Sequence, residues 1–96
     1  MATINLSWTP PAEANGGSAT QYKIWRKEGT HASGSTIGSD PDQNWPKTVA
    51  HSGAATASQT YADTSAVFGA TYSYTVKGSN AAGDSANYSS PDNAQA

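Results

Sequence analysis

Strict alternation of apolar and polar residues is the most regular pattern in the chain. In the stretch TINLSW, Ile4, Leu6 and Trp8 alternate with small polar residues. A period of two places these three side chains on one face of an extended segment, so the stretch predicts a half-buried strand. The strand is expected to end at Pro10 and Pro11, because proline has no backbone N–H to donate to a neighbouring strand.

The same period recurs along the chain. It predicts further strands over residues 21–27, 45–50, 58–63, 71–79 and 85–90. In the first of these, QYKIWRK, Tyr22 and Ile24 are expected to face the core, which turns Lys23, Trp25 and Lys27 outward. The core expected from this parity consists of Leu6, Trp8, Tyr22, Ile24, Tyr61, Tyr72, Tyr74 and Val76.

No segment has apolar residues at the three-and-four spacing of a helix, so no helix is predicted. Short strands separated by turn signals predict an all-β sandwich or barrel. Residues 29–44, GTHASGSTIGSDPDQN, are rich in Gly, Ser and Asp and are expected to form a long mobile loop. We expect one domain over residues 1–90, followed by a flexible tail over 91–96.

Composition narrows the class of protein. The chain has 96 residues, of which 12% are charged, and its net charge is −2 without a basic run. This charge balance argues against a protein that binds nucleic acid or that contacts a membrane through a polybasic segment. The chain has no cysteine, which excludes disulfides and thiolate chemistry, and no apolar run of the ~18 residues that a membrane-spanning helix needs. Its first residues, MATINLSW, do not resemble a signal peptide.

Two longer stretches resemble a fibronectin type III domain. SWTPPAEANGGSATQY is similar to that family's strand-B tryptophan, Pro-Pro pair, Gly-rich loop and strand-C tyrosine. YADTSAVFGATYSYTVKGSNAAGDSA is similar to its strands E, F and G, with the corner between E and F. The form resembles modules of bacterial polysaccharide-degrading enzymes and of phage structural proteins. The resemblance implies an immunoglobulin-like antiparallel β-sandwich.

The resemblance also implies roles for three aromatic residues. Trp8 and Tyr22 would come from opposite sheets and meet between them. Tyr72 takes the position of the family's tyrosine corner, so its hydroxyl is expected to bond to the backbone near residues 66–68. Gly69 would permit the tight turn that precedes it.

The sequence departs from the family pattern at the corner and at the front. Ala66 and Phe68 stand where the family usually has Leu and Pro, so Val67 or Phe68 is expected to refill the space beside Ala66. Gly78 replaces a usual Ala and is expected to loosen the strand end. Strand A is expected to be short or absent, which would leave the strand over 3–8 with an open edge for self-pairing or for a donated strand.

Candidate catalytic groups are sparse. His31 and His51 lie in polar loops and are expected to be solvated. The carboxylates are expected to scatter over the surface, with Asp63 capping a turn; they are Glu13, Glu28, Asp40, Asp42, Asp63, Asp84 and Asp92. Residues 40–44, DPDQN, begin like a calcium loop but lack its later glycine and glutamate. We therefore predict no catalytic, metal or cofactor site.

Two tryptophans are the candidates for ligand contact. Parity places Trp25 on the outer face of the sheet, and Trp45 lies in or beside the next strand. Exposed rings at this spacing can stack on sugars, with Asp40, Asp42 and Asn44 as polar partners. The alternatives are that Trp25 packs beneath the following loop and against Trp45, or that it contacts a neighbouring domain.

The resemblance implies a non-catalytic spacer or docking module of a larger secreted, cell-surface or virion protein. Its partners would then be neighbouring domains of the same polypeptide, and neither nucleic acid nor a membrane is expected. Two alternatives stay open: a carbohydrate-binding accessory module that uses Trp25 and Trp45, and a protein–protein adaptor that pairs through the open edge of the first strand.

Overall fold

The computed structural model describes residues 2–10, 19–54, 57–81, 83–84, 89 and 92–96. Their elements in chain order are β1 (Ala2–Trp8), β2 (Gln21–Glu28), α1 (Gly34–Ser39), β3 (Lys47–Ala50), β4 (Gln59–Ala66), β5 (Thr71–Asn80), β6 (Gly83–Asp84) and β7 (Asp92–Gln95).

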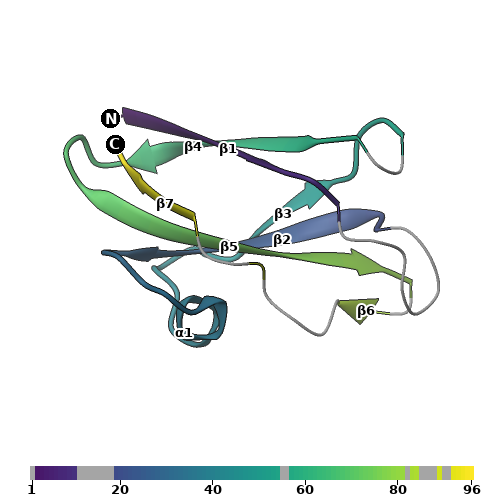
Figure 1. Cartoon of the computed structure of the whole chain (residues 1–96), viewed down its shortest axis with the longest axis horizontal. Coiled ribbons are helices and arrows are strands. Elements are labelled where there is room, and N and C mark those ends of the chain that lie inside the picture. Colours follow the sequence, from purple (N-terminus) through teal and green to yellow (C-terminus); the bar gives the residue numbers. More distant parts are fainter. Residues whose placement is uncertain (1, 11–18, 55–56, 82, 85–88, 90–91) are drawn as a thin grey trace.

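The strands form two antiparallel sheets packed face to face (Figure 1). The first sheet consists of β1 and β4. The second has the order β3-β2-β5, and β6 and β7 pair with β5 on the edge away from β2. The predicted all-β sandwich is therefore confirmed. Within the described ranges, no helix has the length and apolar character to cross a membrane.

Most of the strands that alternation predicted are present. β1, β2, β4 and β5 match four of them, and β3 begins at Lys47, inside the predicted 45–50 strand. The predicted strand over 85–90 lies outside the described residues except for Ser89, and so does Glu13.

The 29–44 segment is folded, so the predictions of a mobile loop and of no helix are both wrong. It contains α1, which lies on the side of the second sheet opposite β1 and β4 (Figure 1). Ile37 in α1 is completely buried. A single apolar residue creates no periodicity in the sequence, although its burial is enough to fix one short helical turn against a sheet.

The described C-terminal residues, 92–96, are paired with the rest of the chain, where a tail over 91–96 was predicted. β7 pairs with β5 from Thr71 to Tyr74. Beyond it, the Ala96 N–H donates to the Ala70 carbonyl (2.9 Å), and the Gly69 N–H donates to the Ala96 carbonyl (2.8 Å). These bonds use backbone groups, which every non-proline residue supplies. The side chains of the polar sequence DNAQA therefore give no signal from which the strand could be predicted.

Most of the predicted core is buried between the sheets. Leu6, Tyr22, Ile24, Tyr72 and Tyr74 are buried, and Trp8, Tyr61 and Val76 are partly buried against the same cluster. As expected, Trp8 of the first sheet meets Tyr22 of the second edge to face, with 5.4 Å between ring centroids. Three buried residues of this cluster were not on the predicted list: Ile4, Trp45 and Ala66.

The predicted tyrosine-corner contact is present. The Val67 N–H donates to the Tyr72 hydroxyl over 3.0 Å and fixes the turn between β4 and β5. Ala66 is fully buried, but Val67 and Phe68 are 62% and 85% exposed. The expectation that one of these two refills the core beside Ala66 is therefore wrong, because the turn directs both side chains into solvent.

Candidate functional site

The two tryptophans that are candidates for ligand contact are both buried, at 9% for Trp25 and 8% for Trp45. Trp25 pairs opposite Thr75 on the outer face of the second sheet, which α1 covers. Trp45 belongs to the core on the other face, 6.0 Å from the ring of Tyr74 and 6.2 Å from that of Tyr61. Trp25 thus lies beneath the 29–44 segment, as one alternative predicted. The same alternative predicted a contact between Trp25 and Trp45, and this is wrong, because the two rings lie on opposite faces of the second sheet.

The three polar residues proposed beside these rings do not converge on one site. The Nζ of Lys27 lies 3.0 Å from Oδ2 of Asp40, whose side chain is 84% exposed. Asp42 instead turns toward β2 and pairs with Arg26. Asn44 is exposed, with a φ of +73° in the turn before β3. Asp40 and Asp42 therefore hold the 29–44 segment to β2.

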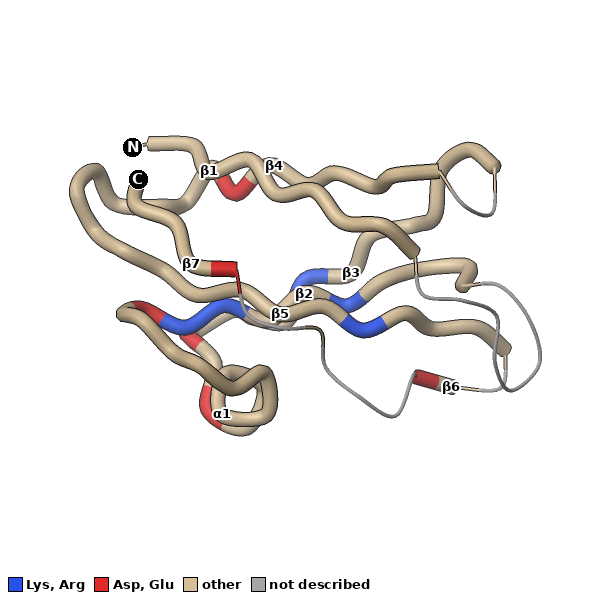
Figure 2. The backbone as a smooth tube through the Cα atoms, viewed as in Figure 1, with Lys and Arg blue, Asp and Glu red and all other residues tan. Residues whose placement is uncertain are grey.

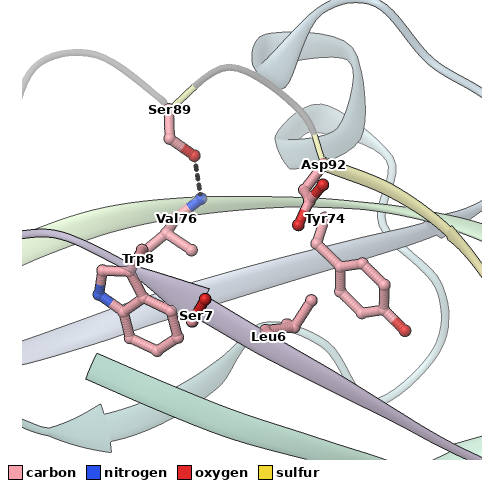
Figure 3. Close-up of a pocket in the computed structure, with 7 residues that line it drawn as sticks. All are labelled: Leu6, Ser7, Trp8, Tyr74, Val76, Ser89 and Asp92. Carbon is pink, nitrogen blue, oxygen red and sulfur yellow. Dashed lines mark hydrogen bonds between the residues drawn. The ribbon is translucent and has the colours of Figure 1, made fainter. Parts of the chain in front are cut away.

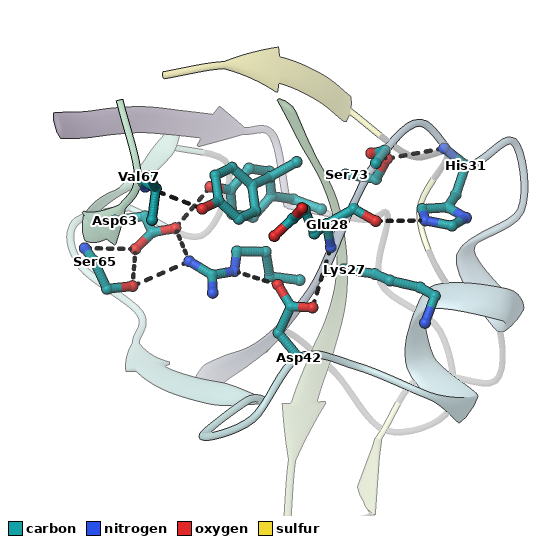
Figure 4. A network of polar contacts seen from close by, with 12 residues as sticks. Lys27, Glu28, His31, Asp42, Asp63, Ser65, Val67 and Ser73 are labelled. Carbon is teal, nitrogen blue, oxygen red and sulfur yellow. Dashed lines mark hydrogen bonds and ion pairs between the residues drawn. The ribbon is translucent and has the colours of Figure 1, made fainter. Parts of the chain in front are cut away.

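A partly buried ionic cluster lies at the end of β2, and it consists of Arg26, Asp42, Asp63, Ser65 and Tyr74. The Arg26 Nε donates to Asp42 Oδ2 (2.8 Å), and its Nη1 donates to Asp63 Oδ2 (3.0 Å) and to Ser65 Oγ (3.1 Å). Figure 4 shows Asp42, Asp63 and Ser65 around this network. We call these five residues the Arg26 cluster.

Aromatic rings enclose the guanidinium of the Arg26 cluster. Its Cζ lies 4.4 Å from the ring centroid of Tyr72 and 5.0 Å from that of Trp45. A planar guanidinium is more weakly hydrated than an ammonium and stacks well on aromatic faces. The strand position of Arg26, opposite Tyr74, is therefore compatible with an apolar core.

Asp63 is the most buried charged group of the cluster, since its side chain is 2% exposed. Burial by itself would raise its pKa, but hydrogen bonds from Ser65, Tyr74 and Arg26 outweigh burial and hold the pKa below its usual value. Burial and the bond to Asp63 both raise the pKa of Tyr74 far above its ordinary value. The cluster thus keeps Asp63 ionised and Tyr74 neutral at pH 7.

The lone pairs of Asp63 are fully used. Its Oδ1 accepts from the N–H and hydroxyl of Ser65 at 3.0 and 2.7 Å, and its Oδ2 accepts from Tyr74 and Arg26 at 2.7 and 3.0 Å. A carboxylate offers about four acceptor positions, so none is left for a substrate or a metal ion. Asp63 is buried, so the prediction that it lies at the surface is wrong. Its side chain does make a local bond to the backbone, at Ser65, which lies within β4.

Both histidines make defined contacts and are not simply solvated. The Nε2 of His31 lies 2.9 Å from the Glu28 carbonyl, and the backbone N–H of His31 donates to the Ser73 hydroxyl. His51 Nδ1 lies 2.7 Å from the Tyr22 hydroxyl. In the described part of the chain, no three His, Cys, Asp or Glu side chains are grouped to hold a metal ion.

A pocket of about 260 Å³ opens beside β1, between the two sheets (Figure 3). Leu6 and Trp8 line it from β1, and Tyr74 and Val76 line it from β5. The other described residues that line it are polar: Ser7, Ser89 and Asp92. The indole Nε1 of Trp8 is buried without a hydrogen-bond partner among the described residues.

The Arg26 cluster was missed as a unit, although one sequence signal was available. Parity places Arg26 on the same face as Tyr22 and Ile24, and a charged residue at such a position requires a buried partner. The partner, Asp63, lies 37 residues away in the sequence. Arg26 and Asp63 meet because the sheet of β1 and β4 packs over β2. Only this packing shows which carboxylate pairs with Arg26.

No known protein family, curated protein or solved structure matches this chain. The structure shows a β-sandwich. Membership of the fibronectin type III family therefore stays a prediction.

Proposed function

We propose that the chain is a non-catalytic docking module, of fibronectin type III type, in a larger secreted, cell-surface or virion protein. The described polar groups support a structural role. Asp42 and Asp63 both pair with one arginine, and the Asp63 lone pairs are saturated. Neither carboxylate is free to act as a general acid or base, which must reach a proton on a substrate.

The observation that carries the docking role is an apolar turn beside both ends of the chain. Ala2 pairs with Ala66 at the end of β4, and Ala96 bonds to Gly69 and Ala70 in the next turn. Figure 1 shows both chain ends at this one pole. Val67 and Phe68 are exposed large apolar residues at this pole.

The exposed pair Val67 and Phe68 favours docking over the spacer role. Exposed apolar residues that are grouped often mark a contact with another domain or protein. The carbohydrate alternative loses its basis, because the rings of Trp25 and Trp45 are buried.

Hydrogen exchange measured by mass spectrometry tests the proposal. The module is compared alone and within its parent polypeptide, and we expect added protection over residues 67–70, of at least tenfold in exchange rate. Phe68→Ser should remove this protection in the parent polypeptide without changing the exchange rates of the isolated module. Ala62→Ser, at an exposed position of β4, serves as the control. Equal exchange of the 67–70 turn in both contexts would refute the docking role.

A further inference from the structure

The two layers of the sandwich have different widths on the β1 side. Within the described residues, the first layer ends at β1, which pairs only with β4. The second layer continues past β5 through β7 and Ser89, whose N–H donates to the Val76 carbonyl (3.0 Å). Because the pocket reaches from β1 to Ser89 and Asp92, β7 and Ser89 lie beyond the open edge of β1. Among the described residues, none pairs with β1 on the side away from β4, which is the position for one more strand of the first layer.

The open edge of β1 presents a backbone that only another strand can satisfy fully. A strand with one neighbour directs the N–H and C=O groups of alternate residues away from that neighbour. Natural edge strands are usually protected by charged residues or proline, but Ala2–Trp8 contains neither. In Figure 2, β1 carries no acidic or basic position along its length. The edge is thus chemically open to pairing.

The pocket adds side-chain selection to this backbone edge. An extended chain paired with β1 would direct every second side chain toward the second layer, above the pocket. The pocket wall there is made by Leu6, Trp8, Tyr74 and Val76, so an apolar side chain fits it (Figure 3). Asp92 is the charged residue of the rim and favours a cation on the incoming chain.

We propose that the β1 edge and this pocket form an acceptor site for an extended segment of a partner protein. The segment has apolar side chains at alternate positions and a lysine or arginine near Asp92. A second copy of this chain does not fit, because its own β1 would bring a second layer into the space that β7 and Ser89 occupy. The site is separate from the Val67–Phe68 turn, so either role can fail without the other.

Three blocked heptapeptides are suitable probes: threonine alternating with valine, leucine or phenylalanine, each ending in lysine. They are titrated to millimolar concentration into isotope-labelled protein while its amide and indole NMR signals are followed. We expect saturable shifts in Thr3–Trp8, the Trp8 indole and Val76, with at least one peptide binding at submillimolar concentration. Exchange of the outward β1 amides should slow at least tenfold on binding.

Two controls separate strand pairing from general adhesion. N-methylation of alternate peptide bonds keeps the side chains but removes the donors, and it should weaken binding at least tenfold. Asp92→Lys should weaken binding severalfold, whereas Asp40→Lys, at another exposed carboxylate, should not. The proposal is overturned if no probe shifts β1, if the N-methylated peptide binds equally, or if β1 signals shift only with the concentration of the protein itself.

Discussion

Arg26 shows how a charged residue occupies a core-facing strand position. Its guanidinium pairs with Asp63 and Asp42 and stacks between two aromatic rings, so its charge and its hydrogen-bond donors are both compensated. Neighbouring Lys27 faces the other way and pairs with exposed Asp40. Adjacent cations on one strand thus make ion pairs of very different burial.

This contrast predicts unequal costs for two adjacent substitutions. Arg26→Met leaves ionised Asp63 buried without its cation, and we expect it to lower the free energy of unfolding by about 3–5 kcal/mol. Lys27→Met removes an exposed pair and should cost at most about 1 kcal/mol. Urea unfolding at pH 7 measures both. Similar losses for the two variants would show that the Arg26 cluster does not stabilise the fold as described.

Asp63 also predicts how stability depends on acid. Its pKa is lower in the folded chain than in the unfolded chain, where an aspartate has a pKa of about 3.9. Its contribution is therefore complete above that pH and is lost as the pH falls through the folded-state pKa. Urea unfolding below about pH 4 should lose up to about 1.4 kcal/mol per pH unit through this group, and Asp63→Asn should flatten the slope.

Asp84 provides the control for the acid experiment. A hydrogen bond from Lys23 lowers the pKa of Asp84 as well, but both side chains are 34% exposed. Salt screens an exposed pair, so Asp84→Asn in 0.15 M salt should leave the acid slope nearly unchanged. An equal flattening by both variants would contradict a special role for the buried carboxylate.

At the scale of elements, the sequence predicted the strands that have a local pattern of side chains and missed the elements that depend on distant contacts. β1, β2, β4 and β5 were predictable because their side chains alternate, and alternation is local. α1 and β7 were not, because one is fixed by the burial of a single residue and the other by backbone pairing. Trp45 was placed outside the core for a similar reason, since only the chain path after Asn44 turns its ring inward.

Ile37 should be decisive for α1. Its side chain is fully buried where α1 meets the second sheet, so Ile37→Ala should lower the free energy of unfolding by about 2–4 kcal/mol. The indole signal of Trp25 should also shift toward its unfolded position, since α1 covers that face. Thr36→Ala, at an exposed position of the same helix, should change neither measurement. An Ile37→Ala variant as stable as the parent would contradict the packing of α1.

Tyr72 should be decisive for the turn between β4 and β5. Tyr72→Phe removes the acceptor of the Val67 N–H and should cost about 1–3 kcal/mol in urea unfolding. Phe68→Ala in the same turn changes an 85% exposed side chain and should stay within about 0.5 kcal/mol. A larger loss from Phe68→Ala than from Tyr72→Phe would show that the turn is held by its apolar residues instead.

At the scale of the molecule, the sandwich combines a stable interior with two outward-facing features. The interior is closed by aromatic contacts between the sheets and by the Arg26 cluster, which joins β2, β4 and β5. The Val67–Phe68 turn lies at the pole of both chain ends, and the β1 edge lies along one side. We propose that the module is attached at the first of these surfaces and binds an extended chain at the second.

The most direct test of this architecture is a nuclear Overhauser experiment on a sample labelled in its aromatic side chains. Two ring pairs join the first sheet to the layer that faces it: Trp8 with Tyr22 of β2 at 5.4 Å, and Tyr61 with Trp45, just before β3, at 6.2 Å between centroids. We predict cross-peaks between ring protons of both pairs, together with slow exchange of the Tyr74 hydroxyl proton. Absence of both sets of cross-peaks, with ring shifts close to those of the unfolded chain, would contradict a sandwich closed around these residues.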